Sequence, residues 1–91
     1  SGNWAMTAGG TNAGDYTHGT AKHVAVTFPS GRFSQAPVVV SSVSEVRVSH
    51  AVLNRTTTGC TIRTWNNSGG NASNNYVYWQ AVQMTSQSAG E

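Results

Sequence analysis

The chain has 91 residues, the length of one small domain, and only 9% of them are charged. Its net charge is +2, from five basic and three acidic residues, and no two lysine or arginine residues are adjacent. Because binding to nucleic acid requires clustered basic residues, this dispersed charge argues against a nucleic-acid partner. No apolar run approaches the ~20 residues of a membrane-spanning helix, so we expect no insertion into a membrane.

Asparagine, serine, threonine and glycine take the place of the missing charges and predict an uncharged, hydrogen-bonding surface. Such a surface is common in extracellular β proteins and virion fibres, and it can bind neutral sugars. A domain this small has a thin core, so association with copies of itself would stabilise it. Cys60 is the single cysteine, which excludes an intrachain disulfide and a cysteine zinc site. The start at Ser1 and Gly2, without methionine, predicts a tag remnant on a fragment of a longer protein.

The first 15 residues are polar and are predicted to form an N-terminal segment with one short strand around Trp4 and Met6. Alternation of apolar and polar residues, without helical periodicity, then predicts a β domain over residues 16–84. Its strands are expected at residues 22–28, 38–43, 45–53, 60–65 and 76–84. Residues 66–75 are rich in Asn, Ser and Gly and predict a loop, and residues 85–91 predict a flexible tail.

The alternation also assigns side chains to faces. Cys60 and Ile62 fall on one face of their strand, and Arg63 and Trp65 fall on the other. Trp79 alternates with small apolar residues and is expected in the core. Five or six short strands separated by turns predict an all-β fold, either a sandwich or a small barrel.

The sequence offers little for catalysis, and we predict that the chain is not an enzyme. A glycosidase needs two carboxylates in one cleft, and Asp15 and Glu45 are the only candidates apart from the terminal Glu91. Cys60 with His50 would be a possible nucleophile and base. Because Cys60 shares a strand face with an isoleucine, a small buried apolar residue is the favoured interpretation.

Metal and cofactor sites are not expected. Asp15, His18 and His23 match no strong zinc signature, and exposed polar residues explain them equally well. His50 is placed among the apolar positions of its strand, where a polar side chain needs a partner. Either it is a hydrogen-bonded core or interface histidine, or three copies of it meet near a trimer axis and hold an ion or water.

Sugar binding is the chemistry that the remaining residues favour. It combines an aromatic ring under the apolar face of the sugar with amide, hydroxyl and guanidinium groups for the sugar hydroxyls. Trp65 ends a strand and leads directly into Asn66, Asn67 and Ser68. Arg63 shares the face of Trp65, and Arg47 is a charge on an otherwise apolar strand. Each of these side chains also has a structural interpretation as a core or solvated residue.

Residues 23–84 resemble the H-type lectin domain, about two-thirds of the chain. The matching features, in order, are Val-Thr-Phe-Pro at 26–29, Phe33, Ala-Pro-Val-Val-Val at 36–40, Val-Arg-Val at 46–48, Thr-Thr-Thr-Gly at 56–59, Thr-Trp at 64–65, and Trp79 with Ala81. Residues 56–84 also resemble the C-terminal ends of minor tail proteins from actinobacterial phages. This second resemblance implies an extracellular location at the tip of a virion tail.

The resemblance implies a six-stranded antiparallel β-sandwich, a homotrimer, and one sugar site per subunit junction for N-acetylgalactosamine or a related sugar. Arg47 and Trp65 match the sugar-contacting arginine and the strand-end tryptophan of the family, and Asn66 stands where a known member has histidine. Asp15 is a loose candidate for the family's acidic contact. The loop after Trp65 is longer than in that member, and Cys60 replaces a usual phenylalanine.

Two functions from different classes therefore remain. The first is a carbohydrate-binding host-recognition domain of a phage tail protein, which binds a host cell-surface glycan through Arg47, Trp65, Asn66, Arg63 and Asp15. The second is a trimeric structural cap of a tail fibre with no ligand. A secreted eukaryotic lectin for N-acetylgalactosamine is a further alternative.

Overall fold

The computed structural model describes residues 4–84, and this part of the chain is all-β. Its strands are β1 (Trp4–Asn12), β2 (Ala21–Thr27), β3 (Val38–Val43), β4 (Val48–Leu53), β5 (Gly59–Asn66) and β6 (Tyr76–Met84). Within these residues there is no helix long and apolar enough to cross a membrane. The predicted tag remnant at residues 1–2 and the predicted tail at residues 85–91 lie outside the described residues.

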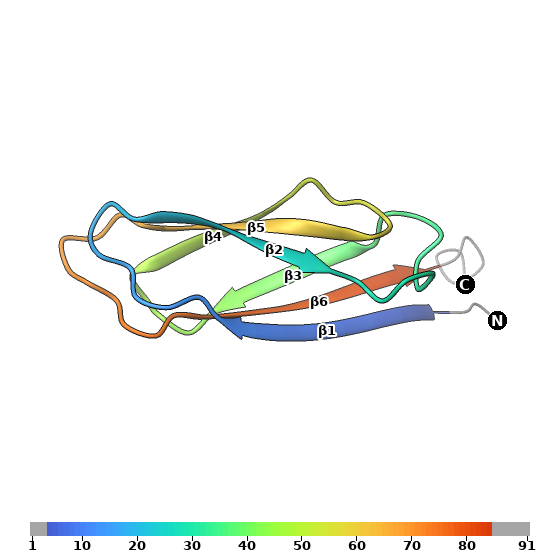
Figure 1. The fold of residues 1–91 in the computed structure, drawn as a ribbon, viewed down its shortest axis with the longest axis horizontal. Coiled ribbons are helices and arrows are strands. Elements are labelled where there is room, and N and C mark those ends of the chain that lie inside the picture. Colours follow the sequence, from blue (N-terminus) through green and yellow to red (C-terminus); the bar gives the residue numbers. More distant parts are fainter. Residues whose placement is uncertain (1–3, 85–91) are drawn as a thin grey trace.

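The strands form two three-stranded antiparallel sheets that lie face to face (Figure 1). The order is β1-β6-β3 in one sheet and β2-β5-β4 in the other. The predicted all-β class with six antiparallel strands is therefore confirmed. Strands β4 and β5 pair with each other and are consecutive in the sequence, whereas the other three pairings join distant parts of the chain.

The core lies between the sheets and consists of the side chains that alternation turns inward. Its fully or nearly buried members are Val26, Phe28, Phe33, Cys60, Ile62, Val77 and Ala81. The Phe28 ring packs edge-on against Phe33, with the ring centroids 5.2 Å apart, and also contacts Trp79 at 5.7 Å. The predicted inward faces of Cys60, Ile62 and Trp79 are thus confirmed.

Strand β1 is longer than the short strand predicted around Trp4 and Met6. It continues through Gly9 and Gly10 and pairs with β6 over its whole length. The Trp79 and Tyr78 rings lie across these two glycines, because a Cβ atom at either position would be 2.7 Å from a ring carbon. Aromatic side chains of β6 therefore cover the glycines, which have no side chain of their own to pack.

Strand β4 begins three residues later than predicted, at Val48 rather than at residue 45. Residues 45–47 form a turn that is closed by a hydrogen bond from the Val48 amide to the Glu45 carbonyl. Val46 is 96% exposed, so it does not share the inward face of Val48 and Val52 as the alternation suggested. The turn moves Arg47 from the strand to its edge.

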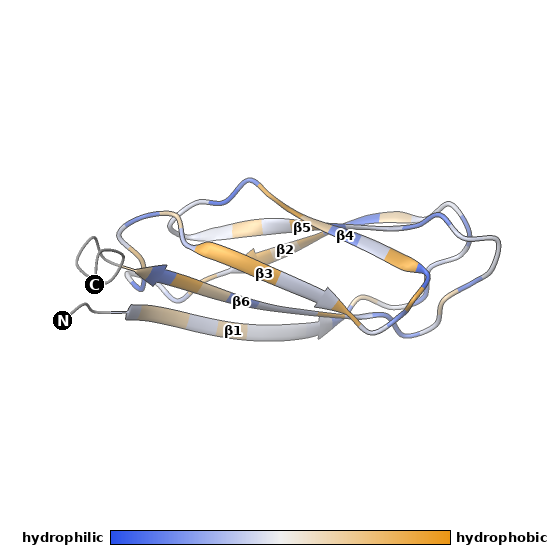
Figure 2. Cartoon of the chain, turned by 180° about the vertical axis from the view of Figure 1, so that it is seen from behind, coloured by the Kyte–Doolittle hydropathy of each residue, from blue (hydrophilic) through white to orange (hydrophobic). Residues whose placement is uncertain are grey.

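The two ends of the sandwich are formed by different parts of the chain. Trp4 pairs with Met84, so β1 begins and β6 ends at the same end, which we call the terminal end. The connections 13–20, 44–47 and 67–75 gather at the opposite end, which we call the loop end (Figure 1). Figure 2 shows mostly hydrophilic or neutral colours in these three connections.

Candidate functional site

Asn66 joins the connections of the loop end. Its side chain is fully buried, and Nδ2 donates hydrogen bonds to the carbonyl oxygens of Tyr16 and Gly70, each at 2.9 Å. Its Oδ1 accepts hydrogen bonds from the backbone amide and the hydroxyl of Ser68, at 2.9 and 2.7 Å. Tyr16, also buried, shares a 2.6 Å hydrogen bond with the Thr64 hydroxyl. This network fixes the start of the loop after β5.

The network corrects one expectation about the site. Asn66 was expected to contact sugar directly, but all of its hydrogen-bonding groups are engaged inside the protein and none is exposed. Its place at the site is taken by the next two residues, Asn67 and Ser68, which the sequence marked only as neighbours. The hydrogen bond from the Ser68 amide to Asn66 Oδ1 closes an Asx turn, a local turn that asparagine favours.

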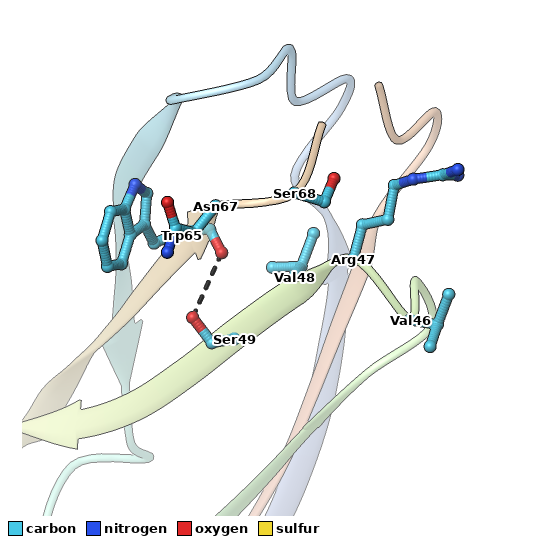
Figure 3. Close-up of a pocket in the computed structure, with 7 residues that line it drawn as sticks. All are labelled: Val46, Arg47, Val48, Ser49, Trp65, Asn67 and Ser68. Carbon is cyan, nitrogen blue, oxygen red and sulfur yellow. Dashed lines mark hydrogen bonds between the residues drawn. The ribbon is translucent and has the colours of Figure 1, made fainter. Parts of the chain in front are cut away.

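A shallow groove lies at the loop end, between the turn before β4 and the end of β5 (Figure 3). It has a volume of about 560 Å³ and is lined by Val46, Arg47, Val48, Ser49, Trp65, Asn67 and Ser68. The lining thus combines one indole, one guanidinium, one amide and two hydroxyls. Figure 3 shows Trp65 and Arg47 at opposite ends of the groove, with Ser68 and Val48 between them.

Trp65 is the aromatic surface of this groove. It is 36% exposed and lies on the outer face of β5, where its direct cross-strand neighbours are the small residues Ala21 and Ser49. Ser49 Oγ donates a hydrogen bond to the Trp65 carbonyl at 3.2 Å. The Arg63 guanidinium lies 5.5 Å from the centre of the Trp65 ring. The indole stays accessible because its cross-strand neighbours are small, and the Arg63 guanidinium packs against one side of the ring.

Arg47 approaches the loop after β5. A Cβ atom added to Gly70 would be 2.9 Å from Arg47 Nε, so the guanidinium lies directly over this glycine. The structure therefore brings Arg47, Trp65 and Arg63 to one region, as the sequence grouped them. Asp15 does not line the groove: its Oδ1 accepts a hydrogen bond from the Asn74 amide at 2.8 Å within the loop end.

The other chemically notable residues have structural partners. His50 turns inward at the open side of the sandwich, where its Nδ1 and Ser41 Oγ share a 2.7 Å hydrogen bond. His18 Nδ1 donates to the Ser68 carbonyl and thereby ties the connection 13–20 to the loop after β5. Burial raises the pKa of the Cys60 thiol above 9.0, although the charge of Arg55 opposes this shift.

Among the described residues, no three His, Cys, Asp or Glu side chains gather in a way that would hold a metal ion. The groove itself contains only neutral groups and one guanidinium. Its chemistry is that of hydrogen bonding and of stacking against an aromatic ring.

Comparison with known proteins points to tail fibres. No protein-family model and no curated protein sequence matches the chain. An N-truncated R1-type pyocin tail fibre is similar in structure, with a TM-score of 0.72 and 26% identity, over 86% of this chain and 69% of that one. A fragment of the P. aeruginosa R1 pyocin fibre has a TM-score of 0.69 and 26% identity.

The second match covers 86% of this chain but only 22% of the fibre fragment, so the chain corresponds to a small part of that fragment. The fold, an all-β sandwich of two three-stranded sheets, is thus one that pyocin tail fibres also contain. The chain is a tail-fibre-like domain in this structural sense.

Proposed function

We propose that the chain is a carbohydrate-binding host-recognition domain of a phage-type tail protein, located outside the cell at the tip of the tail. The observation that carries this proposal is the groove at the loop end, where an exposed tryptophan lies among amide, hydroxyl and guanidinium groups. This is the combination with which proteins bind sugar rings and their hydroxyls. The similarity to pyocin tail fibres supports the assignment to a tail.

The position of the groove supports this role. The described residues begin and end at the terminal end, where Trp4 pairs with Met84. The groove lies at the opposite end, on the loops. A fibre attached at the terminal end would therefore present the groove outward, toward a host surface.

We further propose that the domain assembles as a homotrimer through the outer face of the β1-β6-β3 sheet. None of these three strands contains a charged residue. The outer face carries seven of the ten large hydrophobic side chains that are exposed in the described residues: Trp4, Met6, Val38, Val40, Tyr76, Tyr78 and Met84. Figure 2 shows the hydrophobic first half of β3 beside β6.

The size of this face fits a stable contact between copies. The seven residues are 41–63% exposed, and a whole aromatic side chain alone has about 150–250 Å², so together they expose on the order of several hundred Å². Monomeric proteins rarely expose apolar patches larger than a few hundred Å². A standard protein interface buries ~800 Å² per partner, so packing against neighbouring copies would use most of this face.

A binding role rather than a catalytic one agrees with the placement of the carboxylates. Asp15 holds the backbone of Asn74, and Glu45 belongs to the turn before β4. Neither lines the groove, whereas glycoside hydrolysis needs two carboxylates flanking the bound sugar.

A ligand-free structural cap is the second candidate, and one observation favours it. Figure 3 shows the Arg47 side chain extending away from Trp65, so the polar groups of the groove do not converge on a single sugar-sized point. The cap and the binding domain share the fold and the proposed trimer. They differ in whether the groove retains a glycan.

The test is a glycan array and a host cell-wall binding assay with the purified domain and its Trp65→Ala variant. We expect selective retention that Trp65→Ala removes, because the variant loses the ring against which the sugar stacks. Leu53→Ala is the matched control, since Leu53 is an exposed apolar residue on the outer face of the same sheet. No retention by the wild type would favour the structural cap, and retention that survives Trp65→Ala would contradict the groove as the binding site.

A further inference from the structure

Most cationic side chains of this chain are held by its own backbone. Lys22 Nζ donates a hydrogen bond to the Ala13 carbonyl, and the ammonium also lies 4.4 Å from the centre of the Tyr16 ring. Arg32 donates to the Met6 carbonyl at the edge of β1, and Arg55 donates to the Pro37 carbonyl. These three cations stabilise loops and strand edges and have a clear structural role.

Arg47 and Arg63 differ from them. Neither makes a hydrogen bond or an ion pair with any other residue that the structure describes. Arg63 stacks on the Trp65 indole, and Arg47 lies at the other end of the same groove. The two guanidiniums without protein acceptors are thus the two that lie at the proposed sugar site.

Arg63 can still donate hydrogen bonds while its guanidinium stacks on Trp65. A guanidinium over a ring uses its flat face, whereas its five N–H groups point outward in the plane of the group. The Gly70 backbone beneath Arg47 accepts no hydrogen bond from it, because the contact is one of close packing and the Gly70 carbonyl accepts from Asn66 and Ser68. Both side chains therefore present free donors to solvent.

Among the residues that the structure describes, no carboxylate forms an ion pair with Arg47 or Arg63. The acidic residues of the described part are Asp15 and Glu45, and neither lines the groove or lies in β2, β4 or β5. His23 is the direct cross-strand neighbour of Arg63 and adds a further nitrogen base on the same outer face. An anionic group that approaches Trp65 therefore meets guanidinium donors from both ends of the groove.

We infer that the ligand of this site is an acidic glycan, a chain of sugars that carries carboxylate or phosphate groups. The inference rests on the proposed sugar-binding function and specifies its substrate class. One sugar ring stacks on Trp65, and Arg47 and Arg63 bind acidic groups on the neighbouring sugars. Arginine suits this role because its planar fork matches the two oxygens of a carboxylate or phosphate.

The arrangement also requires a chain of sugars rather than one terminal residue. Arg63 precedes Trp65 on β5, on the side away from the loop end, whereas Arg47 lies at the far end of the groove. A ligand that contacts both must extend past the indole in both directions. Binding should therefore strengthen from monosaccharide to oligosaccharide.

The experiment uses an array that contains neutral glycans, uronate-containing glycans and phosphorylated glycans of several lengths. We expect the acidic glycans to bind best, and the arm that dominates identifies the acid as carboxylate or phosphate. Arg47→Gln and Arg63→Gln should each weaken binding of the best acidic glycan by about tenfold or more, because each removes a charged hydrogen bond. Arg32→Gln, which removes the same charge at a distance, should change it little.

A second measurement uses the best acidic glycan and its neutralised derivative, the methyl ester or the dephosphorylated chain. We expect the neutral derivative to bind at least tenfold more weakly, and higher salt to weaken only the acidic form. Equal binding of neutral glycans that depends on Trp65 but not on the arginines would overturn this inference and leave the sugar-binding function intact. Absence of binding to every glycan would overturn both.

Discussion

Gly70 determines where Arg47 lies, and this dependence can be tested at the level of one atom. A Cβ atom at position 70 would be 2.9 Å from Arg47 Nε, so alanine there must displace the guanidinium. Gly70 does not have a positive φ angle, so its backbone accepts alanine without strain. The arginine side chain is flexible and can move away, so the fold should tolerate the change.

We therefore expect Gly70→Ala to weaken glycan binding several-fold while the free energy of unfolding changes by less than about 1 kcal/mol. Gly69→Ala is the matched control, because a Cβ atom there has no neighbour within 4 Å. Titration calorimetry with the best array ligand measures the first effect, and urea unfolding measures the second. Unchanged affinity in Gly70→Ala would show that the position of Arg47 is irrelevant to binding.

Cys60 gives a prediction about pH. Burial raises the pKa of its thiol above the ordinary 9.0, so the folded protein holds this proton more tightly than the unfolded chain does. Below pH 9 the thiol is protonated in both states and this contribution to stability is fully present. As the pH rises past 9, the unfolded thiol ionises first and the contribution is lost.

We expect the free energy of unfolding of the wild type to fall more steeply above pH 9 than that of Cys60→Ala. The variant is less stable at neutral pH because it leaves a small cavity, so the slopes and not the absolute values are compared. All other ionisable groups are the same in both proteins, so their contributions cancel in the difference. Parallel slopes would contradict a raised thiol pKa.

At the scale of elements, the loop after β5 depends on the side chain of Asn66. Replacement by alanine removes hydrogen bonds to the carbonyls of Tyr16 and Gly70 and to the amide of Ser68 inside a buried site. We expect Asn66→Ala to lower the free energy of unfolding by about 2–4 kcal/mol, since buried polar groups then lose their partners. Asn67→Ala, at an exposed neighbour, should cost less than about 1 kcal/mol in the same urea titration. Equal losses would contradict the structural role of Asn66.

The strands show how much of the secondary structure the alternation of apolar and polar residues predicts. The alternation located β2, β3, β5 and β6 to within about one residue, because each places one apolar face on the core. It failed at the start of β4, where Val46 fits the alternation but lies in a turn. That turn is held from outside the segment: the Glu45 amide donates to Asn75 Oδ1, and the Ser44 amide donates to the Tyr76 carbonyl. Such distant partners leave no local signal.

The candidate site was predictable to a similar extent. Residue type and strand position were enough to group Trp65, Arg63 and Arg47, because alternation gives the face and the turn follows the strand. The same reasoning could not separate Asn66 from Asn67, which have the same side chain and adjacent positions. Only the buried carbonyls of the connections 13–20 and 67–75 determine which of the two turns inward.

At the scale of the whole molecule, the two outer faces of the sandwich have different compositions. The outer face of the β1-β6-β3 sheet is apolar and free of charged residues, whereas the outer face of the other sheet carries His23 and Arg63. The proposed trimer would bury the first face and leave the second, with Trp65, toward solvent. Assembly and glycan binding would then use opposite sides of one small domain, and three sites on one trimer would raise the avidity for a host surface.

If the trimer forms through the β1-β6-β3 face, a substitution on that face should abolish the trimer while each domain stays folded. Val40 lies on the outer face of the edge strand β3 and is 60% exposed, so in a trimer Val40→Asp would bury an uncompensated carboxylate. We expect light scattering to give the mass of a trimer for the wild type and of a monomer for Val40→Asp. Ala25→Asp is the matched control, because Ala25 is exposed on the outer face of the opposite sheet.

Because folding and assembly would be linked, the melting temperature of the wild type should rise with protein concentration, and that of Val40→Asp should be lower and independent of it. The dilution series on the wild type is informative even if Val40→Asp fails to fold, since it needs no variant. A wild-type melting temperature that stays constant over a hundredfold dilution, together with a monomer mass, would contradict the trimer. The apolar face would then require a different partner, such as another part of the tail.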